Sequence, residues 1–201
     1  MNDSANPRNV AIFIFDEVEV LDFAGPFEVF SVAGHPRGLH PFNVYTVGEK
    51  PGVVNARNQL SVTPRFSFGD CPPPAILVIP GGYGTRPLLE NKPVLDWIET
   101  CAGEAELVLS VCSGSLLLAK LGLLDGLGAT SHQSALDELR ALSPSTRIES
   151  GLRFVDNGKV VTSAGVAAGI DMSFHVVRRL CGDEIALETA RYMEYDWSGE
   201  N

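Results

Sequence analysis

The sequence has little of what would mark a membrane, metal or nucleic-acid-binding protein. No apolar run in its 201 residues approaches the roughly 18 residues needed to cross a bilayer, so we expect no membrane partner. The N-terminal residues are polar and lack the apolar stretch of a signal peptide, which predicts a cytoplasmic protein. The formal net charge is −10 and Lys and Arg form no cluster, so we expect no nucleic-acid partner.

Cysteine and histidine are also scarce, with four of each in the chain. The cysteines are Cys71, Cys101, Cys112 and Cys181, and no two of them form a C-x-x-C pair. A structural zinc site and a disulfide framework are therefore not expected. We predict neither a metal nor a cofactor.

What is present fits one globular domain. Apolar residues make up 45% of the chain and charged residues 20%, the profile of an ordinary soluble fold. We interpret residues 1–8 as a disordered leader and residues 9–201 as a single domain.

Buried-strand patterns alternate with helical patterns along the chain. Buried apolar runs predict strands over 9–15, 75–79 and 107–111. We also expect a strand over 42–47 and a short strand over 129–131. Turn signals predict hairpins over 53–62 and 154–163. Helical spacing predicts helices over 21–33, 88–101, 113–121, 133–142, 165–180 and 183–195. This order predicts an α/β fold, a flavodoxin-like three-layer sandwich with a mostly parallel sheet and helices on both faces.

Three strand ends carry residues suited to chemistry. Asp22 follows the first strand, Gly81 and Gly82 follow the strand over 75–79, and Cys112 follows the strand over 107–111. In open α/β sheets, binding sites lie beyond the carboxyl ends of the strands. We therefore expect these three ends to be neighbours in space.

Cys112 stands between a buried strand and a helix, flanked by small residues in Ser110-Val111-Cys112-Ser113-Gly114-Ser115. This is the cysteine analogue of a nucleophile elbow, where a tight turn exposes the side chain above the sheet. The N-terminus of the following helix would stabilise a thiolate. The simpler interpretation is a buried cysteine that acts as a small hydrophobic residue.

The neighbouring candidates each have a structural alternative. The N–H groups near Gly82, with that of Ser113, form either an anion-stabilising pocket or an ordinary loop. Asp22 is either a helix N-cap or a proton carrier whose pKa is raised beside the thiol. His132 follows a short strand and is either a general base or a residue on the pocket rim. His175, in the middle of a helix, is interpreted as packing.

These residues fall in motifs that resemble the ThiJ/PfpI superfamily, the glutamine-amidotransferase-like α/β sandwiches. The matching segments are 15–26 (FDEVEVLDFAGP), 79–82 (IPGG), 111–115 (VCSGS), 122–126 (GLLDG), 129–132 (ATSH) and 162–171 (TSAGVAAGID). They occur in order and span about residues 9–195. Within the superfamily, the chain is most similar to the isocyanide (isonitrile) hydratases. The same pattern occurs in the amidase-like N-terminal domains of AraC-type regulators, whose C-terminal helix-turn-helix domain we do not expect here.

The resemblance implies a small-molecule enzyme and a homodimer. Cys112 would be the nucleophile, Asp22 the acid beside it, and Gly82 and Ser113 the backbone donors. The reaction would convert an isocyanide to an N-formamide through a covalent thioimidate on Cys112, with Asp22 handling protons. Candidates for the pocket wall are His132, Tyr83, Val166 and Phe23.

Three departures narrow the activity. Ser113 stands where the peptidases of the superfamily carry His, which disfavours peptide cleavage. Residues 164–171 contain no His, so the amidotransferase triad is absent. Gln133 replaces the Trp that follows His132 in the hydratases and would reshape the pocket. Two alternatives stay open, a cysteine-based oxidative-stress sensor and a glyoxalase or amidase acting on small carbonyl compounds.

Overall fold

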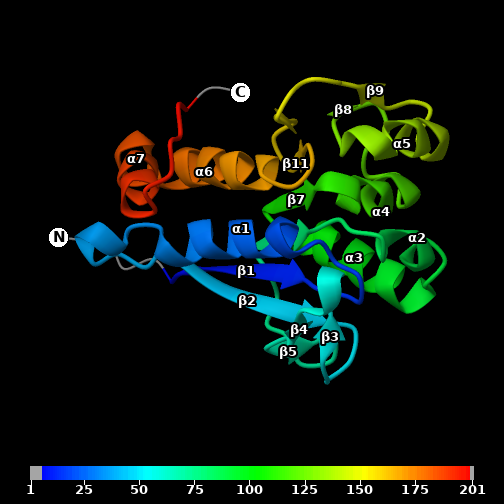
Figure 1. Cartoon of the computed structure of the whole chain (residues 1–201), viewed down its shortest axis with the longest axis horizontal. Helices are drawn as coiled ribbons and strands as arrows, with labels where there is room; N and C mark the ends of the chain where they lie inside the picture. The colour runs from blue at the N-terminus through cyan, green and yellow to red at the C-terminus, as the bar shows by residue number, and fades with distance from the viewer. Residues whose placement is uncertain (1–5, 200–201) are drawn as a thin grey trace.

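A seven-stranded sheet forms the middle layer of the computed structural model, which describes residues 6–199 (Figure 1). Its strand order is β10-β11-β7-β6-β1-β2-β5, and only the edge pair β10–β11 is antiparallel. The strands are β1 (Arg8–Phe13), β2 (Phe42–Gly48), β5 (Phe66–Ser67), β6 (Ile76–Ile79), β7 (Leu107–Val111), β10 (Phe154–Asp156) and β11 (Val160–Ser163). The predicted mostly parallel α/β sandwich is confirmed.

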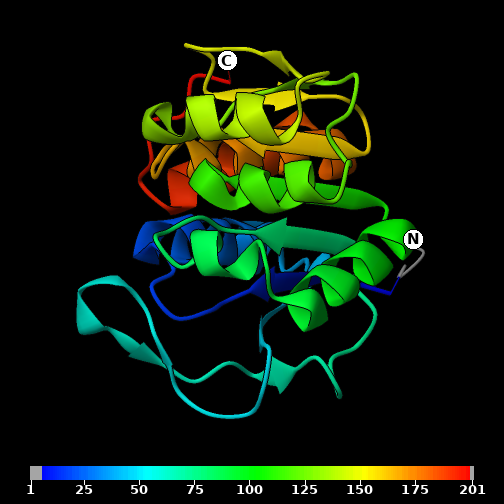
Figure 2. The same cartoon turned by 90° about the vertical axis from the view of Figure 1, so that its right-hand side faces the viewer.

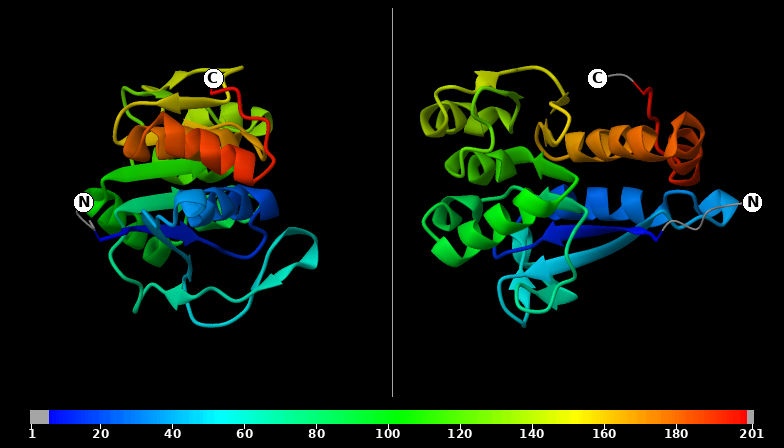
Figure 3. Two further views of the ribbon diagram at one scale, coloured as in Figure 1. Left: turned by 90° about the vertical axis from the view of Figure 1, so that its left-hand side faces the viewer. Right: turned by 180° about the vertical axis from the view of Figure 1, so that it is seen from behind.

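Helices cover both faces of this sheet. Figures 2 and 3 show α1, α6 and α7 on one face and α2, α3, α4 and α5 on the other. The helices are α1 (Val20–Val32), α2 (Thr85–Leu88), α3 (Lys92–Glu104), α4 (Ser115–Lys120), α5 (Leu136–Leu142), α6 (Ala168–Cys181) and α7 (Asp183–Tyr192). Because both faces are covered, every residue of β6 and β7 is buried. This burial explains why β6 is a continuous apolar run and why β7 is apolar except at Ser110.

The short elements depart most from the sequence-based boundaries. The helix predicted over 88–101 corresponds to α3, which begins only at Lys92 because Asn91 caps it by accepting a hydrogen bond from the Val94 N–H (3.3 Å). The short helix α2, which ends at Leu88, was not predicted. The hairpin over 53–62 is present as β3 (Val54–Asn55) and β4 (Ser61–Val62), with the 3-10 turn η2 (Arg57–Gln59) between them. The strand over 129–131 is β8 (Gly128–Ala129), paired with β9 (Arg147–Ile148), which was not predicted.

Most of the predicted leader over 1–8 lies outside the described residues, which begin at residue 6. Its last residue, Arg8, is already the first residue of β1. Within residues 6–199, no helix combines the length and apolar character that a membrane span requires.

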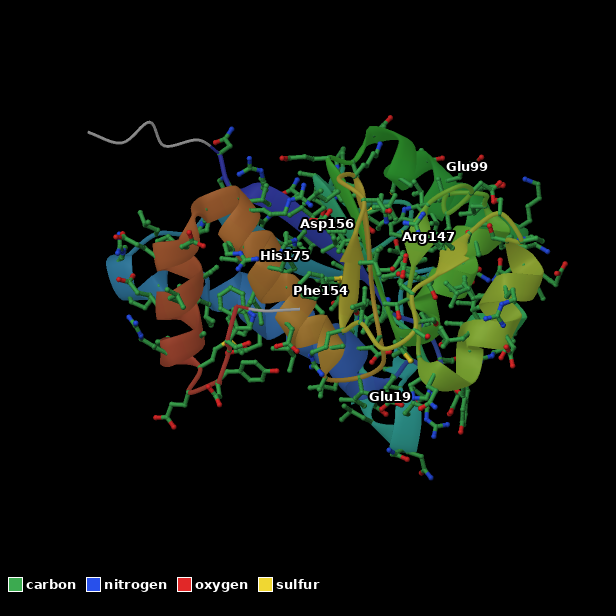
Figure 4. All side chains as sticks on the ribbon, turned by 90° about the horizontal axis from the view of Figure 1, so that it is seen from above. Glu19, Glu99, Arg147, Phe154, Asp156 and His175 are labelled. Atoms are coloured by element: carbon green, nitrogen blue, oxygen red, sulfur yellow. The ribbon has the colours of Figure 1, made fainter. Side chains whose placement is uncertain are left out.

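The β10–β11 hairpin is tied to α6 by a charged cluster. Asp156 accepts hydrogen bonds from His175 Nε2 (2.7 Å) and Arg179 (2.8 Å), and the His175 ring lies 4.6 Å from that of Phe154. Figure 4 shows Phe154, Asp156 and His175 side by side. His175, predicted only to pack, therefore also forms a hydrogen bond with Asp156. Burial opposes the ionisation of Asp156, but the hydrogen bonds from His175 and Gly158 and the Arg179 charge lower its pKa overall.

We expect Asp156→Asn to lower the free energy of unfolding at neutral pH by about 1 kcal/mol. Because the folded-state pKa lies below the ordinary 3.8, this contribution is present above that pH and is lost as the pH falls through the folded-state value. Urea unfolding at several pH values measures it. Asp96→Asn is the matched control, because the ion pair of Asp96 with Lys92 is mostly exposed. Equal effects of the two variants at pH 7 would contradict the assignment.

Candidate active site

Cys112 lies at the turn between β7 and α4 and has a backbone φ of 57°. This left-handed conformation costs a non-glycine residue about 1–2 kcal/mol, so surrounding contacts must hold it in place. The Cys112 carbonyl accepts hydrogen bonds from the hydroxyls of Ser115 (3.2 Å) and Ser131 (2.9 Å). Its N–H donates to the Ala164 carbonyl (3.3 Å). The strained turn aims the side chain above the sheet, as a nucleophile elbow does.

The loop after β6 closes directly onto this turn at Gly81. A Cβ atom at Gly81 would lie 2.8 Å from both Asp22 Oδ2 and the Cys112 Cβ, and 2.6 Å from the Ser113 nitrogen. Only glycine leaves room for that approach. The three strand ends predicted to be neighbours therefore meet at one point.

Asp22 is not the N-cap that the sequence allowed. Helix α1 begins at Val20 after Glu19, so Asp22 lies in its first turn, fully buried. Asp22 Oδ2 accepts a hydrogen bond from the Gly81 N–H (3.0 Å), whereas Oδ1 makes no hydrogen bond of standard geometry within residues 6–199. The helix thus presents a buried carboxyl with one oxygen available to the reacting centre.

The Asp22 carboxyl and the Cys112 thiol each resist ionisation. Burial raises the pKa of Asp22 to about 7, and the Glu19 charge adds to this, against the hydrogen bonds from Gly81, Cys112 and the Val166 N–H that lower it. Burial raises the pKa of Cys112 to about 12, and the Asp22 charge raises it further. The expectation of a thiol acidified by a helix N-terminus is therefore wrong, because burial outweighs the donors from Ser113. Near neutral pH the two groups share a proton.

Gly82 is engaged within the loop and not free to bind a ligand. Its N–H donates to the Ser113 hydroxyl (3.1 Å), and its carbonyl accepts from the hydroxyls of Thr85 (2.8 Å) and Ser113 (3.2 Å). The Gly82 N–H, predicted to donate to a ligand, donates to Ser113 in this structure. The Ser113 N–H, in contrast, is close enough to the Cys112 sulfur to lower its pKa.

A cavity of about 180 Å³ opens beside the Cys112 side chain. Predicted site residues on its wall are Gly82, Tyr83, Cys112, Ser113, His132 and Val166. The placement of Phe23 in the wall is wrong, because Phe23 does not line this cavity and packs in the hydrophobic core. Four wall residues were not predicted: Glu19, Arg57, Arg86 and Ser134.

The two arginines of the cavity wall that were not predicted, Arg57 and Arg86, do not belong to the three strand ends. Arg57 comes from the turn between β3 and β4, and its guanidinium lies 3.8 Å from the centre of the Tyr83 ring. The Arg57 N–H donates to the Val18 carbonyl (2.9 Å), which fixes the hairpin over the cavity. Arg86 comes from α2 and pairs with Glu138 of α5 (2.7 Å). Nothing in the sequence around Arg57 distinguishes it from an ordinary surface arginine.

His132 lies on the rim of the cavity with a defined orientation. Its Nδ1 accepts the Ser134 N–H (3.1 Å), so the neutral ring carries its proton on Nε2. A Cβ atom at Gly165 would lie 2.2 Å from His132 Cδ2, so the glycine makes room for the ring. In this tautomer Nε2 is a hydrogen-bond donor. Within residues 6–199, no group of three His, Cys, Asp or Glu side chains is placed to hold a metal ion.

Comparison with known proteins agrees with this geometry. Residues 8–179 match the DJ-1/PfpI family. The chain is 33% identical over 186 residues to an isonitrile hydratase of Pseudomonas putida, covering 92% of this chain and 78% of that protein. It is 24% identical to the HTH-type transcriptional regulator GbdR of Pseudomonas aeruginosa, of which it spans 52%.

Two solved structures share the fold. A ThiJ/PfpI family protein from Pseudomonas syringae superposes with a TM-score of 0.85 at 29% identity, covering 98% of this chain and 82% of that one. Drosophila melanogaster DJ-1beta superposes with a TM-score of 0.81 at 21% identity, covering 95% of this chain and all of that one, 100%. The second likeness bears on the fold alone.

Proposed function

The chain belongs to the DJ-1/PfpI family, and we propose that it is a cysteine-dependent hydratase that converts a small isocyanide to an N-formamide. The observation that carries this proposal is the buried Asp22 carboxyl beside the Cys112 thiol. One group supplies a nucleophile and the other a titratable proton with a pKa of about 7, near the pH at which proton transfer is most effective.

The reaction begins when Cys112 is the thiolate and Asp22 holds the shared proton. The sulfur attacks the terminal isocyanide carbon, forming an S–C bond, and that carbon takes the Asp22 proton to give a thioimidate. Water then adds to the same carbon, and Asp22 passes one water proton to the nitrogen. As the S–C bond breaks, Cys112 leaves as thiolate, Asp22 takes the hydroxyl proton, and the N-formamide is released.

The cavity limits the size of the substrate. A volume of about 180 Å³ is below the range of about 300–1,000 Å³ that is common for drug-sized ligands. It therefore suits a small electrophile and leaves no room for a peptide. The proton on His132 Nε2 is a second donor at the rim, available to the substrate nitrogen or to water.

An oxidation sensor fits the same residues less well. Peroxide reacts with thiolate, so a sensor cysteine is exposed and has a low pKa. Cys112 is only 7% exposed, which limits the access of peroxide to its sulfur. Its raised pKa bears on both functions equally, since both begin from the thiolate. Intact mass after mild peroxide tests this alternative, which requires that Cys112 oxidise before the other cysteines.

The test of the proposal is incubation of the protein with p-nitrophenyl isocyanide and detection of the formamide. We expect formamide to accumulate over many turnovers. Absence of product from the folded protein would overturn the hydratase proposal. Conversion of methylglyoxal in a parallel assay would instead favour the glyoxalase alternative.

A further inference from the structure

The cavity wall carries charges that the proposed reaction does not use. Glu19, Arg57 and Arg86 all line it, although none of them takes part in the proton transfers between Cys112 and Asp22. Charges inside a recessed site act on any charged molecule that enters, because the surrounding protein screens them less than water does. The balance of these charges therefore bears on which substrates reach the sulfur.

Both guanidinium groups are already neutralised. Arg86 forms a two-pronged pair with Glu138, through Nε (3.1 Å) and Nη2 (2.7 Å), and its Nη1 donates to Thr85 (3.3 Å) and to the Gly82 carbonyl (3.4 Å). Arg57 is shared by two carboxylates, Glu17 (3.4 Å) and Glu19 (3.8 Å). Arg86 is thus occupied by Glu138, and Arg57 is held near two carboxylates and over the Tyr83 ring.

Counted with the ion-pair partners of the two arginines, the charge around the cavity is negative. The wall itself carries Glu19, Arg57 and Arg86, and the partners Glu17 and Glu138 lie outside the wall, so three carboxylates stand against two guanidinium groups. The Cys112–Asp22 pair adds one negative charge at a pH above about 7, where the two groups hold a single proton between them. Glu19 is the carboxylate that lines the cavity itself, and its charge is felt at Asp22, whose pKa it raises.

We propose that Glu19 is a specificity-determining residue that makes this cavity selective for neutral or cationic electrophiles and excludes anionic ones. The inference rests on the proposed function only in taking this cavity as the route to the Cys112 sulfur. In substrate terms, an uncharged isonitrile would be accepted, whereas one that carries a carboxylate would be rejected.

The test compares iodoacetamide with iodoacetate, which deliver the same reacting carbon with and without a negative charge. In both, the sulfur forms an S–C bond as the C–I bond breaks and iodide leaves. The alkylation rate of Cys112 with each reagent is measured on the Cys112 peptide by mass spectrometry. The ratio of the iodoacetamide rate to the iodoacetate rate is then divided by the same ratio for N-acetylcysteine. We expect Cys112 to discriminate against iodoacetate on the order of tenfold more than the free thiol does. Glu19→Gln should remove most of this discrimination.

The matched control is Glu99→Gln, an equal change of net charge on the exposed face of α3. Figure 4 shows Glu19 and Glu99 on opposite sides of the molecule, so this variant should keep the wild-type ratio. Glu138→Gln, which releases Arg86 from its partner, should shift the ratio in the same direction as Glu19→Gln. It provides a second reading if Glu19→Gln fails to fold.

A wild-type ratio equal to that of N-acetylcysteine, or equal shifts in the Glu19 and Glu99 variants, would overturn the charge selection. The readout needs no turnover, so it is separate from the hydratase assay. Charge selection without formamide would refute only the proposed reaction. Formamide without charge selection would refute only the role of Glu19.

Discussion

Replacing Cys112 with alanine is expected to lower kcat/KM for formamide production by at least about 10³-fold, because no other group can form the covalent intermediate. The variant should still fold. Cys112 belongs to the core but lines the cavity, and the hydrogen bonds that hold its turn involve its backbone and the hydroxyls of Ser115 and Ser131. Steady-state kinetics, with circular dichroism to verify folding, measures both effects.

Cys101→Ala is the matched control for this experiment. Cys101 is buried to nearly the same extent, 8% exposed against 7% for Cys112, and burial likewise raises its pKa to about 12. It lies in α3 and lines no part of the cavity beside Cys112. Its loss should cost stability and leave kcat unchanged. Wild-type turnover by Cys112→Ala, or equal loss in both variants, would contradict the nucleophile assignment.

The sheet and its helices were predictable because the burial of each element determines the spacing of apolar residues along its own stretch of sequence. A strand covered on both faces is mostly apolar, as Leu107–Val111 is apart from Ser110, and a parallel strand must be followed by a crossover. The tight turn at Cys112 was predictable for a related reason. A turn directly after such a strand needs small residues, which Ser113, Gly114 and Ser115 supply.

The electrostatics of the site were not predictable, because they depend on contacts between distant segments. The role of Asp22 depends on where α1 begins, and a start at Val20 turns a possible cap into a buried acid. The charged wall depends on a hairpin that brings Arg57 over Tyr83. The raised pKa of Cys112 depends on how completely the loop at Gly81 covers it. The homodimer and the cytoplasmic location stay predictions.

Replacing Asp22 with asparagine is expected to impair activity and at the same time stabilise the protein. Asparagine can still accept the Gly81 N–H but cannot carry the proton that the thioimidate requires, so kcat should fall by about 10²–10⁴-fold. The Cys112 pKa should fall as well, because a neighbouring negative charge that raises it is removed. Alkylation of Cys112 by iodoacetamide at pH 8 should therefore become faster while turnover is lost.

The gain in stability follows from the sign of the Asp22 pKa shift. The folded protein keeps a proton on Asp22 up to a pKa of about 7, whereas the unfolded chain releases it near 3.8. The Asp22 contribution to stability is thus fully present below pH 3.8 and is lost as the pH rises through 7. Asparagine has no such loss, so at pH 8 we expect Asp22→Asn to raise the free energy of unfolding by on the order of 2–4 kcal/mol. Urea unfolding at pH 5 and pH 8 measures the difference, which should be larger at pH 8. A variant that is less stable than wild type at both pH values would contradict this prediction. It would show that the ionised Asp22 carboxylate stabilises the fold, so that its removal costs stability at either pH.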